Sequence, residues 1–496
     1  MKELALFRRA RSHGSAVALS SGGVDTSYET VLNRSSQVAA TLLGELDDLN
    51  EARVAFLVPP SSDYVVAQWG VWRAGGIAIP LCLSATDGEW EYALKDSQAE
   101  ILVVPEGGSD ATVAVAERLG LRVVRLRADA VPSSKGLPEL GGDRRAMILY
   151  TSGTTSKPKG VVSTHGNIQA QIESLVEAWR WQATDRIPLF LPLHHIHGII
   201  NVLACALWIG ARIECYPRFD MGAILERVRA NAFTVFMAVP TIYVKLIQAL
   251  EQSSESDRAA IIRGFGQMRL MISGSAALPA SVHERWTALT GQVLLERYGM
   301  TEIGMALSNP FDGERRPGAV GQALPRVEVR LKSEAGVVVT SEAEVGEIQV
   351  RGPAVFGEYW GKAEVTEKSF DEGWFRTGDV AVMERGYYRI MGRLSVDIIK
   401  SGGYKLSALE IEAVLIEHPQ ILECAVVGVS DETWGEAVAA AIVLVEGESM
   451  ELTELRAWCR DRMSVYKMPH RLAVVLALPR NAMGKVTKPA LRDLFD

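Results

Sequence analysis

Short apolar runs alternate with longer amphipathic stretches through the first two thirds of the chain. The runs have the length and composition of buried strands, and the stretches between them repeat apolar residues at helical spacing. This alternation is typical of α/β layers with largely parallel sheets, so we predict that fold class. We expect helices at 64–73 and 240–250, the second with a proline in its first turn. We expect strands at 54–58, 101–105, 122–126 and 234–239.

The pattern changes after about residue 327, where short alternating runs are separated by glycines. Runs at 346–352 and 386–392 predict a β-rich subdomain. After residue 392 helical and strand patterns return, with a helix at 408–416 and strands at 424–429 and 438–445. We therefore predict a large N-terminal domain, 1–392, of layered α/β subdomains plus a β-rich subdomain. A small α+β C-terminal domain, 393–496, follows it.

Composition excludes several classes of protein. A chain of 496 residues exceeds what one core usually supports, and a net charge of −8 disfavours nonspecific binding of nucleic acid. The longest apolar stretch, 198–211, is interrupted by Asn201 and is shorter than the roughly 20 residues that span a bilayer, so we expect no membrane segment. Five cysteines without a C-x-x-C pair favour a reducing compartment, and we predict a cytoplasmic protein.

Residues 150–160 read Tyr-Thr-Ser-Gly-Thr-Thr-Ser-Lys-Pro-Lys-Gly. Small hydroxyl residues and glycines let backbone N–H groups approach a polyphosphate, while Lys157 and Lys159 offset its charge. The segment is not a Walker A loop, because no Gly-Lys-Ser or Gly-Lys-Thr closes it. A polar turn after a buried strand is the alternative. We predict a nucleotide as the ligand.

Four further motifs follow in a fixed order: 296–302, Thr377-Gly378-Asp379, Gly392-Arg393 and 479–485. Together with 151–160 they resemble the adenylate-forming superfamily of acyl-CoA synthetases, luciferases and peptide-synthetase adenylation domains. The resemblance covers nearly the whole chain. Within the superfamily, His194-His-Ile-His-Gly, 235–243, Arg297 and 401–410 are similar to malonyl-CoA synthetases.

The resemblance implies two half-reactions. A carboxylate attacks the α-phosphate of ATP, giving acyl-AMP and pyrophosphate, and the thiol of coenzyme A then displaces AMP. ATP, Mg²⁺ and coenzyme A are the implied cofactor and co-substrates, and the small C-terminal domain is expected to be mobile. We expect a malonate-like carboxylic acid as substrate, with methylmalonate as a second acid, and a monomer or homodimer.

The same resemblance assigns the catalytic residues and the nucleotide site. Lys485 matches the adenylation lysine, Thr301 a contact to the α-phosphate, and Glu302 the carboxylate that binds Mg²⁺. The alternatives are a solvated lysine and, for Asp379, an ordinary turn residue. The implied ATP-binding residues are Thr151, Ser152, Gly153, Thr154, Thr155, Lys159, Ser275, Ala276, Ala277, Glu296, Tyr298, Gly299, Met300, Thr301, Asp379, Arg393 and Lys485.

Among the predicted site residues, Arg297 gives the most information about which carboxylic acid is the substrate. A monocarboxylate gains nothing from a buried guanidinium, whereas a dicarboxylate offers its distal carboxylate for a charge-assisted pair. The alternative is an arginine paired with Glu296 or with a phosphate. The resemblance places His195, His197, Ser275 and Met305 beside the same acid.

Three imidazoles in His194, His195 and His197 would also suit a metal cluster. No cysteine or carboxylate is spaced nearby to complete it, and the segment runs into an apolar helix, so we favour the acyl-site interpretation. Gly402, Gly403 and Tyr404 match the loop that lines the coenzyme A channel. Ser395 stands where relatives often carry Asp or Lys at the hinge, and the segment is one residue longer, which leaves the pivot open.

Three alternatives to a malonate:CoA ligase remain. The chain could activate another short-chain or aromatic acid, load a carrier protein or act as a luciferase-like oxygenase, or bind a nucleotide without catalysis. The absence of an appended carrier domain and the glycines at 402 and 403 favour free coenzyme A. Retention of Lys485, Glu302 and Asp379 favours catalysis.

Overall fold

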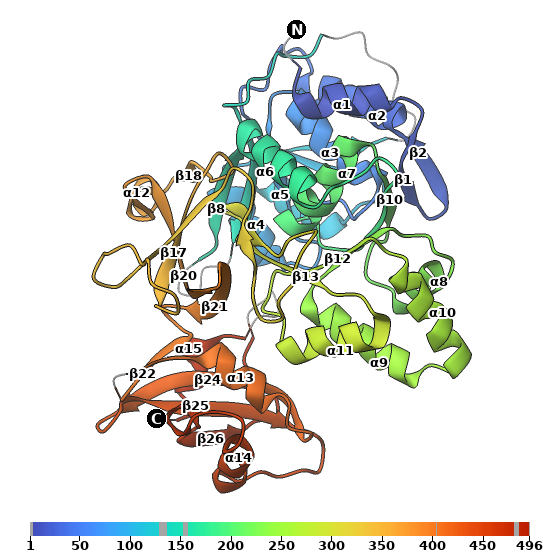
Figure 1. Cartoon of the computed structure of the whole chain (residues 1–496). Helices are drawn as coiled ribbons and strands as arrows, with labels where there is room; N and C mark the ends of the chain where they lie inside the picture. The colour runs from blue at the N-terminus through green and yellow to red at the C-terminus, as the bar shows by residue number, and fades with distance from the viewer. Residues whose placement is uncertain (1–2, 128–135, 152–156, 403, 481–485, 496) are drawn as a thin grey trace. The chain divides into compact units, whose positions relative to one another are not determined.

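A computed structural model describes residues 3–127, 136–151, 157–402, 404–480 and 486–495. The chain forms two compact units, each continuous in space but not in sequence. The first comprises Met1–Glu328 and Val350–Phe375, and the second Val329–Gln349 and Arg376–Asp496 (Figure 1). The second unit contains all of the segment predicted as the C-terminal domain. The predicted limits of 1–392 and 393–496 stay a prediction.

A seven-stranded sheet forms one layer of the first unit, in the order β18-β8-β7-β4-β3-β5-β6. Its five strands from β7 to β6 are parallel, and β8 and β18 extend one edge in antiparallel pairing. The strands are β3 Arg53–Phe56, β4 Ile77–Pro80, β5 Ile101–Pro105, β6 Arg122–Leu126, β7 Arg145–Thr151, β8 Lys159–Thr164 and β18 Glu358–Tyr359.

Two smaller sheets also belong to this unit. One has the order β2-β1-β10-β9, with β1 Val17–Ser21, β2 Val24–Ser27, β9 Arg186–Leu189 and β10 Arg212–Cys215. The other has the order β11-β12-β13-β14-β15, with β11 Val235–Ala238, β12 Leu270–Ser273, β13 Leu295–Met300, β14 Gly304–Ser308 and β15 Gln322–Ala323. In this sheet β11, β12 and β13 are parallel and β13–β14 is an antiparallel hairpin.

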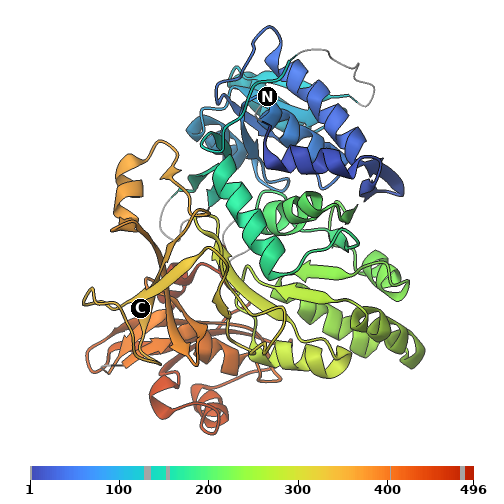
Figure 2. The same ribbon diagram turned by 45° about the horizontal axis from the view of Figure 1, so that its top comes forward.

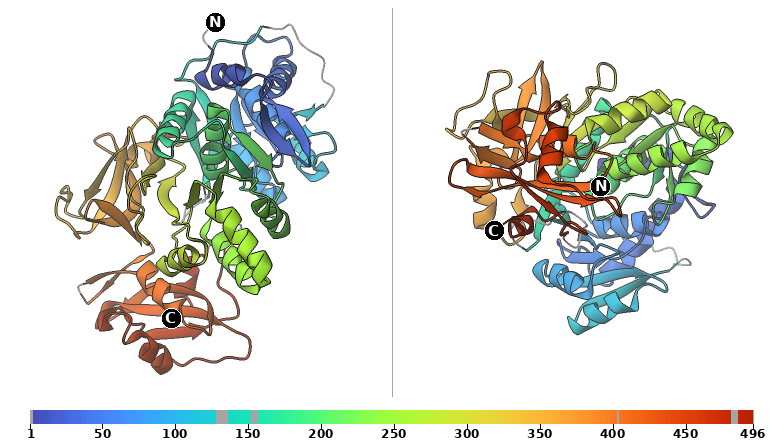
Figure 3. Two further views of the ribbon diagram at one scale, coloured as in Figure 1. Left: turned by 45° about the vertical axis from the view of Figure 1, so that its right-hand side comes forward. Right: turned by 90° about the horizontal axis from the view of Figure 1, so that it is seen from below.

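Most helices pack on these sheets because they bury an apolar face, whereas α12 has no buried residue. Helices α2 and α3 lie side by side, as do α9 and α11 (Figures 2 and 3). One extended core joins the layers and includes the fully buried rings of Trp69, Trp72, Trp179 and Trp286. The helices are α1 Ala5–His13, α2 Tyr28–Leu43, α3 Ser62–Arg73, α4 Asp87–Asp96, α5 Asp110–Arg118, α6 His165–Ala178, α7 Cys205–Ile209, α8 Met221–Arg229, α9 Pro240–Gln252, α10 Glu255–Gly266, α11 Ala280–Thr290 and α12 Ala363–Lys368.

The apolar helix expected at the end of the histidine segment is present, and its first part is a π-helix. His197–Ala204 forms a π-helix, η1, which continues into α7. All eight of its residues are buried, including Asn201, whose side chain has no hydrogen-bond partner among the described residues. A π-helix is rare and often marks a functional site, so its position directly at His197 is informative.

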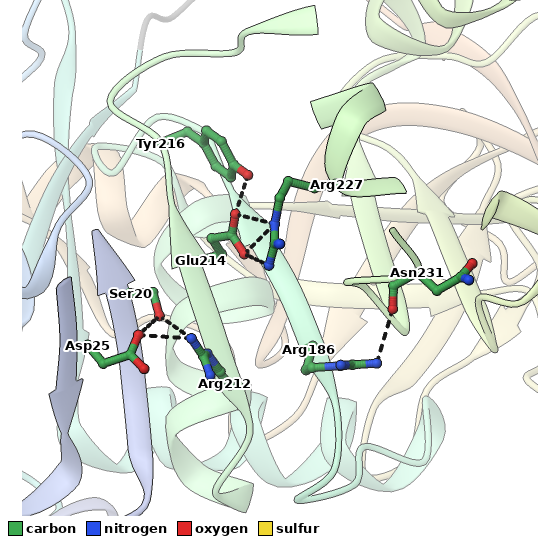
Figure 4. A network of polar contacts seen from close by, with 8 residues as sticks. All are labelled: Ser20, Asp25, Arg186, Arg212, Glu214, Tyr216, Arg227 and Asn231. Carbon is green, nitrogen blue, oxygen red and sulfur yellow. Dashed lines mark hydrogen bonds and ion pairs between the residues drawn. The ribbon is translucent and has the colours of Figure 1, made fainter. Parts of the chain in front are cut away.

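A network of polar contacts lies on and beside the sheet that contains β10 (Figure 4). Arg227 binds Glu214 through two nitrogens, at 2.7 and 2.9 Å, and Tyr216 donates its hydroxyl to the same carboxylate at 2.5 Å. Arg212 donates to Asp25 at 2.8 Å. These pairs are partly exposed, and we expect about 0–1 kcal/mol from each.

The second unit holds a β-hairpin region and a C-terminal α+β part. In the hairpin region β20 (Trp374–Glu384) pairs with β21 (Tyr387–Arg393), and its sheet has the order β16-β17-β20-β19, of which β19 belongs to the residues of the first unit. The C-terminal sheet has the order β23-β22-β25-β24, with β26 beside β25. Further bounds are β16 Glu328–Lys332, β17 Gly346–Arg351, β19 Phe370–Asp371, β22 Ile398–Ser401, β23 Tyr404–Ser407, β24 Ile421–Asp431, β25 Gly435–Leu444 and β26 Arg471–Val474.

Alternate residues of β24 and β25 build two apolar clusters, one on each face of the C-terminal sheet. One cluster includes α13 (Ala408–Leu415) and α14 (Leu452–Cys459), and the other includes Leu491 of α15 (Lys488–Arg492). A short 3₁₀ helix, η2, spans Val465–Lys467. None of the helices among the described residues has both the length and the apolar character that a membrane span requires.

Candidate functional site

The β13–β14 hairpin carries most of the residues predicted in the first unit. Its turn is Thr301-Glu302-Ile303, and Gly304 begins β14 in the left-handed region at φ +66°. Glu302 is buried, and its carbonyl accepts the N–H of Phe356 at 2.8 Å. Thr301 is half-buried beside it. The hairpin therefore fixes the backbone of the predicted phosphate and Mg²⁺ residues.

Tyr359 of β18 connects two predicted site residues that lie far apart in the sequence. Its hydroxyl donates to Oε1 of Glu302 at 2.9 Å, and Nζ of Lys159 lies 4.5 Å from the centroid of its ring. Lys159 pairs in register with Thr151 across β7 and β8, at the two ends of the predicted phosphate segment. The same assembly thus brings a cation and a carboxylate together. Ser152, Gly153, Thr154 and Thr155 lie outside the described residues.

The environment of Glu302 fits the predicted metal. Its carboxylate is held in place by a phenol, and oxygen is the ligand that Mg²⁺ prefers. Mg²⁺ usually takes one or two protein carboxylates and completes its shell with water and substrate phosphates. In the described part of the chain no three His, Cys, Asp or Glu side chains gather into a metal site, so Glu302 would act with the nucleotide.

The three histidines do not form a metal centre with other ligands among the described residues. The rings of His194 and His195 lie against each other, with centroids 4.2 Å apart. His197 turns into the protein instead, since only 4% of its surface is exposed.

Arg297 on β13 is buried, with 3% of its surface exposed. Its guanidinium packs closely against Gly274, because a Cβ at that position would stand 2.5 Å from Cζ of Arg297. Ser275 follows at φ +74°, an uncommon conformation for a residue with a side chain. This strained turn after β12 aims the Ser275 hydroxyl at the arginine, and strain of this kind is concentrated at functional sites.

A hydrogen-bonded chain links Arg297, Ser275 and His197. Nη2 of Arg297 donates to Oγ of Ser275 at 3.1 Å, and the same oxygen lies 3.0 Å from Nδ1 of His197. An arginine can only donate, so the serine accepts from Arg297, and the direction of its bond with Nδ1 depends on the tautomer of His197. Nε2 of His197 has no partner among the described residues.

The positive charge of Arg297 in this hydrogen-bonded network has no counter-ion among the described residues. Burial, and then the charges of Arg297 and His195, hold the pKa of His197 well below its usual value, so its ring is neutral. Burial lowers the pKa of Arg297 to about 9, which leaves it protonated near neutral pH. In the described part of the chain, no carboxylate forms an ion pair with Arg297, and its Nε has no hydrogen-bond partner.

Glu296, the neighbour of Arg297, does not compensate that charge. It is buried, and its Oε1 accepts the N–H of Leu278 at 3.3 Å while Oε2 has no partner among the described residues. Burial raises the pKa of Glu296 to about 8, so the carboxyl is mostly protonated at neutral pH. No ion pair supports the alternative of internal pairing with Glu296 among the described residues, although the two groups interact electrostatically. A buried cation without a counter-ion is costly and suits an anionic ligand.

Other predicted residues surround these groups. Met305 is buried, and its methyl group lies 2.6 Å from where a Cβ at Gly299 would stand. Ala276 and Ala277 are exposed after the Ser275 turn, and Tyr298 and Met300 are half-buried. Their roles at the nucleotide stay predictions.

In the second unit the two predicted ribose contacts meet on one hairpin. Asp379 of β20 and Arg393 of β21 are register partners, and Nε of Arg393 lies 3.1 Å from Oδ1 of Asp379. Gly378 adopts φ +74°, and the Thr377 hydroxyl accepts the N–H of Asp379 at 3.1 Å. The turn presents a fixed carboxylate and a guanidinium, which are suited to hydrogen-bond vicinal hydroxyls.

The predicted channel loop joins β22 to β23. Gly402 has φ +56°, and its N–H binds the carbonyl of Trp434 at 2.8 Å. Tyr404 is exposed and stacks on Tyr466, with centroids 4.6 Å apart. Gly403 and Lys485 lie outside the described residues.

Sequence patterns missed two contacts. Tyr359 belongs to a strand of two residues and carries no motif, so no local signal marks it. Gln171 of α6 lies where a Cβ at Gly304 would stand, 2.4 Å from its Cδ, and its buried Oε1 has no partner among the described residues. Both contacts depend on long-range packing.

Comparison with known proteins identifies the family of this chain. Residues 6–360 match the AMP-binding enzyme family, and residues 410–485 match the AMP-binding enzyme C-terminal domain. The chain belongs to the AMP-binding enzymes.

Relatives within the AMP-binding enzymes are similar over nearly the whole chain. A mitochondrial malonate–CoA ligase of Xenopus laevis is 45% identical over 92% of this chain and 85% of its own length. A malonate–CoA ligase of Arabidopsis thaliana is 39% identical over 99% of this chain and 88% of its own length. ATP-bound MatB of Rhodopseudomonas palustris has a TM-score of 0.87 and 34% identity, covering 100% of this chain and 99% of the other.

Proposed function

We propose that this AMP-binding enzyme is an ATP-dependent malonate:CoA ligase that forms malonyl-CoA through malonyl-AMP, with methylmalonate as a second acid. The observation that carries the proposal is the buried, protonated Arg297 without an internal counter-ion. Two relatives at 45% and 39% identity are named malonate–CoA ligases, which supports the same acid.

The distal carboxylate of malonate would bind Arg297. Nε of Arg297 is a donor there, and Nε2 of His197 is a second one when the ring carries its hydrogen on that nitrogen; both atoms lack partners among the described residues. Arginine and a carboxylate form short, charge-assisted hydrogen bonds. A monocarboxylate would leave the cation desolvated and unpaired, so acetate should be rejected strongly.

The proximal carboxylate would attack the α-phosphorus of ATP and release pyrophosphate. Alignment and charge neutralisation dominate such a step. Thr301, Lys159 and Lys485 would hold the phosphates, Asp379 and Arg393 the ribose, and Glu302 would bind the Mg²⁺ that neutralises developing charge. The thiol sulfur of coenzyme A would then attack the acyl carbon, release AMP and give its proton to solvent. Gly402, Gly403 and Tyr404 would line the path of that thiol.

The test is a coupled assay of AMP release with acetate, malonate, methylmalonate, succinate and benzoate, each with and without coenzyme A. We expect malonate to give the highest kcat/KM and AMP release to depend on coenzyme A. Preference for acetate or benzoate would contradict the proposed acid. Release of acyl-AMP without thioester formation would contradict the ligase.

The compartment and assembly state belong to the same proposal. All five cysteines are free thiols, which supports a reducing compartment such as the cytoplasm. The Xenopus laevis relative is named mitochondrial, so cell fractionation with an epitope-tagged chain is the deciding test. We expect a monomer or homodimer by light scattering.

A further inference from the structure

Lys488 begins α15, three residues after the predicted adenylation lysine, and its side chain is largely buried. Its Nζ lies 2.5 Å from Oδ1 of Asp397 and 2.6 Å from Oε1 of Glu412. Lysine rarely sits in such a place unless it is paired. The side-chain exposures of the three residues, 12, 13 and 18%, make this a buried ion cluster.

Each carboxylate of the cluster is fixed by a second contact. Oδ2 of Asp397 accepts the N–H of Arg393 at 2.9 Å, and Oε1 of Glu412 accepts the N–H of Val426 at 2.7 Å. The backbone of Asp397 also donates to the carbonyl of Arg393 at 2.8 Å and accepts the N–H of Ala408 at 2.8 Å. Lys488 is thereby tied to the segment that carries the predicted ribose contact.

The charges of the cluster hold together despite burial. Burial opposes the charge of Lys488, but the carboxylates of Glu412 and Asp397 outweigh it and raise its pKa. Burial raises the pKa of Glu412, while Lys488 lowers it. Removal of the lysine would leave two desolvated acids close together without a cation. The ion cluster therefore stabilises this arrangement of the three side chains.

The segment on the other side of 481–485 is anchored to the same unit. Thr487 donates its N–H to the carbonyl of Pro479 at 2.8 Å, and Arg480 and Val486 form an antiparallel bridge. Arg480 pairs with Glu423 at 2.8 Å. Leu478 and Leu491 share one apolar cluster. The chain is therefore held immediately before and after 481–485.

We propose that Lys488 is a positioning residue for the first half-reaction, acting through Asp397 to fix residues 486–488, which directly follow Lys485 in the sequence, relative to Arg393. This inference rests on the proposed function, because Lys485 and Arg393 are placed at the nucleotide there. A ribose and its α-phosphate are a fixed distance apart, so two groups that bind them must be spaced correctly. Displacement of a reacting group by about 1 Å can cost about 10²-fold in rate. The second half-reaction does not use Lys485 and should tolerate the change.

The experiment measures both half-reactions in the full chain. Pyrophosphate–ATP exchange reports adenylation, and thioester formation from synthetic acyl-AMP and coenzyme A reports the second step. We expect Lys488→Met to slow exchange by about 10- to 100-fold while thioester formation stays within about twofold. Lys488→Arg, which keeps the charge, should recover most of the exchange rate. Lys368→Met removes an exposed lysine paired with Glu364 at 4.0 Å and should change neither step.

Equal loss in both half-reactions would show a merely structural role and overturn the proposal, as would an unchanged exchange rate. Should Lys488→Met fail to fold, Asp397→Asn must slow exchange selectively, and Glu412→Gln, which keeps the Asp397 contact, must slow it less. All variants are tested with whichever acid the wild type activates best. A wild type that prefers another acid would contradict the malonate proposal and leave this test intact.

Discussion

Two buried cations in this chain have opposite surroundings. Arg297 in the first unit has no counter-ion among the described residues, and its pKa is lowered to about 9 by burial. Lys488 in the second unit has two carboxylates within 2.6 Å, and its pKa is raised because they outweigh burial. The desolvation cost of a buried charge is thus compensated by carboxylates at Lys488 and not at Arg297. An uncompensated cation indicates a ligand, and a compensated one indicates a positioning contact.

The largest expected difference is in stability. Lys488→Met should destabilise the protein by about 3–5 kcal/mol, because it leaves buried acids unpaired. Arg297→Met should leave stability unchanged or raise it, because it removes a desolvated charge that the protein does not pair. Urea denaturation of both variants measures the contrast. A large loss of stability in Arg297→Met would mean that the arginine has a structural partner and would break the comparison.

The contact between Gly274 and Arg297 gives the next largest effect. A methyl group at Gly274 would stand 2.5 Å from the guanidinium carbon and must push it aside. We expect Gly274→Ala to lower kcat/KM for malonate by about 10²-fold with little change in the KM for ATP. Gly222→Ala is the matched control, since its nearest neighbour is 3.6 Å away. Equal effects on malonate and ATP would argue against a specific role of the arginine.

The predicted helices and strands agree with the observed ones where the local sequence pattern determines the secondary structure. Residues 101–105 and 122–126 form β5 and β6 as expected, and α9 begins at Pro240 with proline in its first turn. The site was predictable where chemistry is local: Arg297, Ser275 and His197 were each expected beside the acid, and they form one hydrogen-bonded chain.

Long-range packing explains what the sequence could not predict. Asp397 and Lys488 are 91 residues apart, and no spacing rule brings them together. The neutral state of Glu296 depends on its burial rather than its identity. The π-helix at His197–Ala204 has the same apolar composition as an α-helix, so periodicity cannot distinguish the two.

A smaller effect is expected at the phosphate side of the first unit. Tyr359→Phe removes the hydroxyl that binds Glu302 at 2.9 Å, and we expect about a tenfold loss of pyrophosphate–ATP exchange at limiting Mg²⁺. Tyr216→Phe removes a similar tyrosine–glutamate hydrogen bond in the surface network (Figure 4) and should have no effect on exchange. Restoration of the Tyr359→Phe rate by saturating Mg²⁺ would sharpen the assignment of Glu302. Equal loss at all Mg²⁺ concentrations would count against it.

The smallest effect concerns pH. Glu296 loses its proton near pH 8, and its carboxylate then competes with malonate for Arg297. We expect kcat/KM for malonate to be halved, about a twofold fall, as pH rises to that value, with a further fall as Arg297 loses its proton. Glu296→Gln should remove the first fall and keep the second. A pH profile of Glu296→Gln that matches the wild type would show that this carboxyl does not titrate near the acid.

The central claim is tested most directly by one ratio, kcat/KM for malonate divided by that for acetate, measured for wild type and Arg297→Met. We predict a ratio of about 10⁴ in the wild type, because acetate leaves the buried guanidinium unpaired. In Arg297→Met the ratio should fall to about one, while the exchange activity with acetate is kept or gained. A variant that still prefers malonate by the wild-type factor would show that the distal carboxylate binds elsewhere.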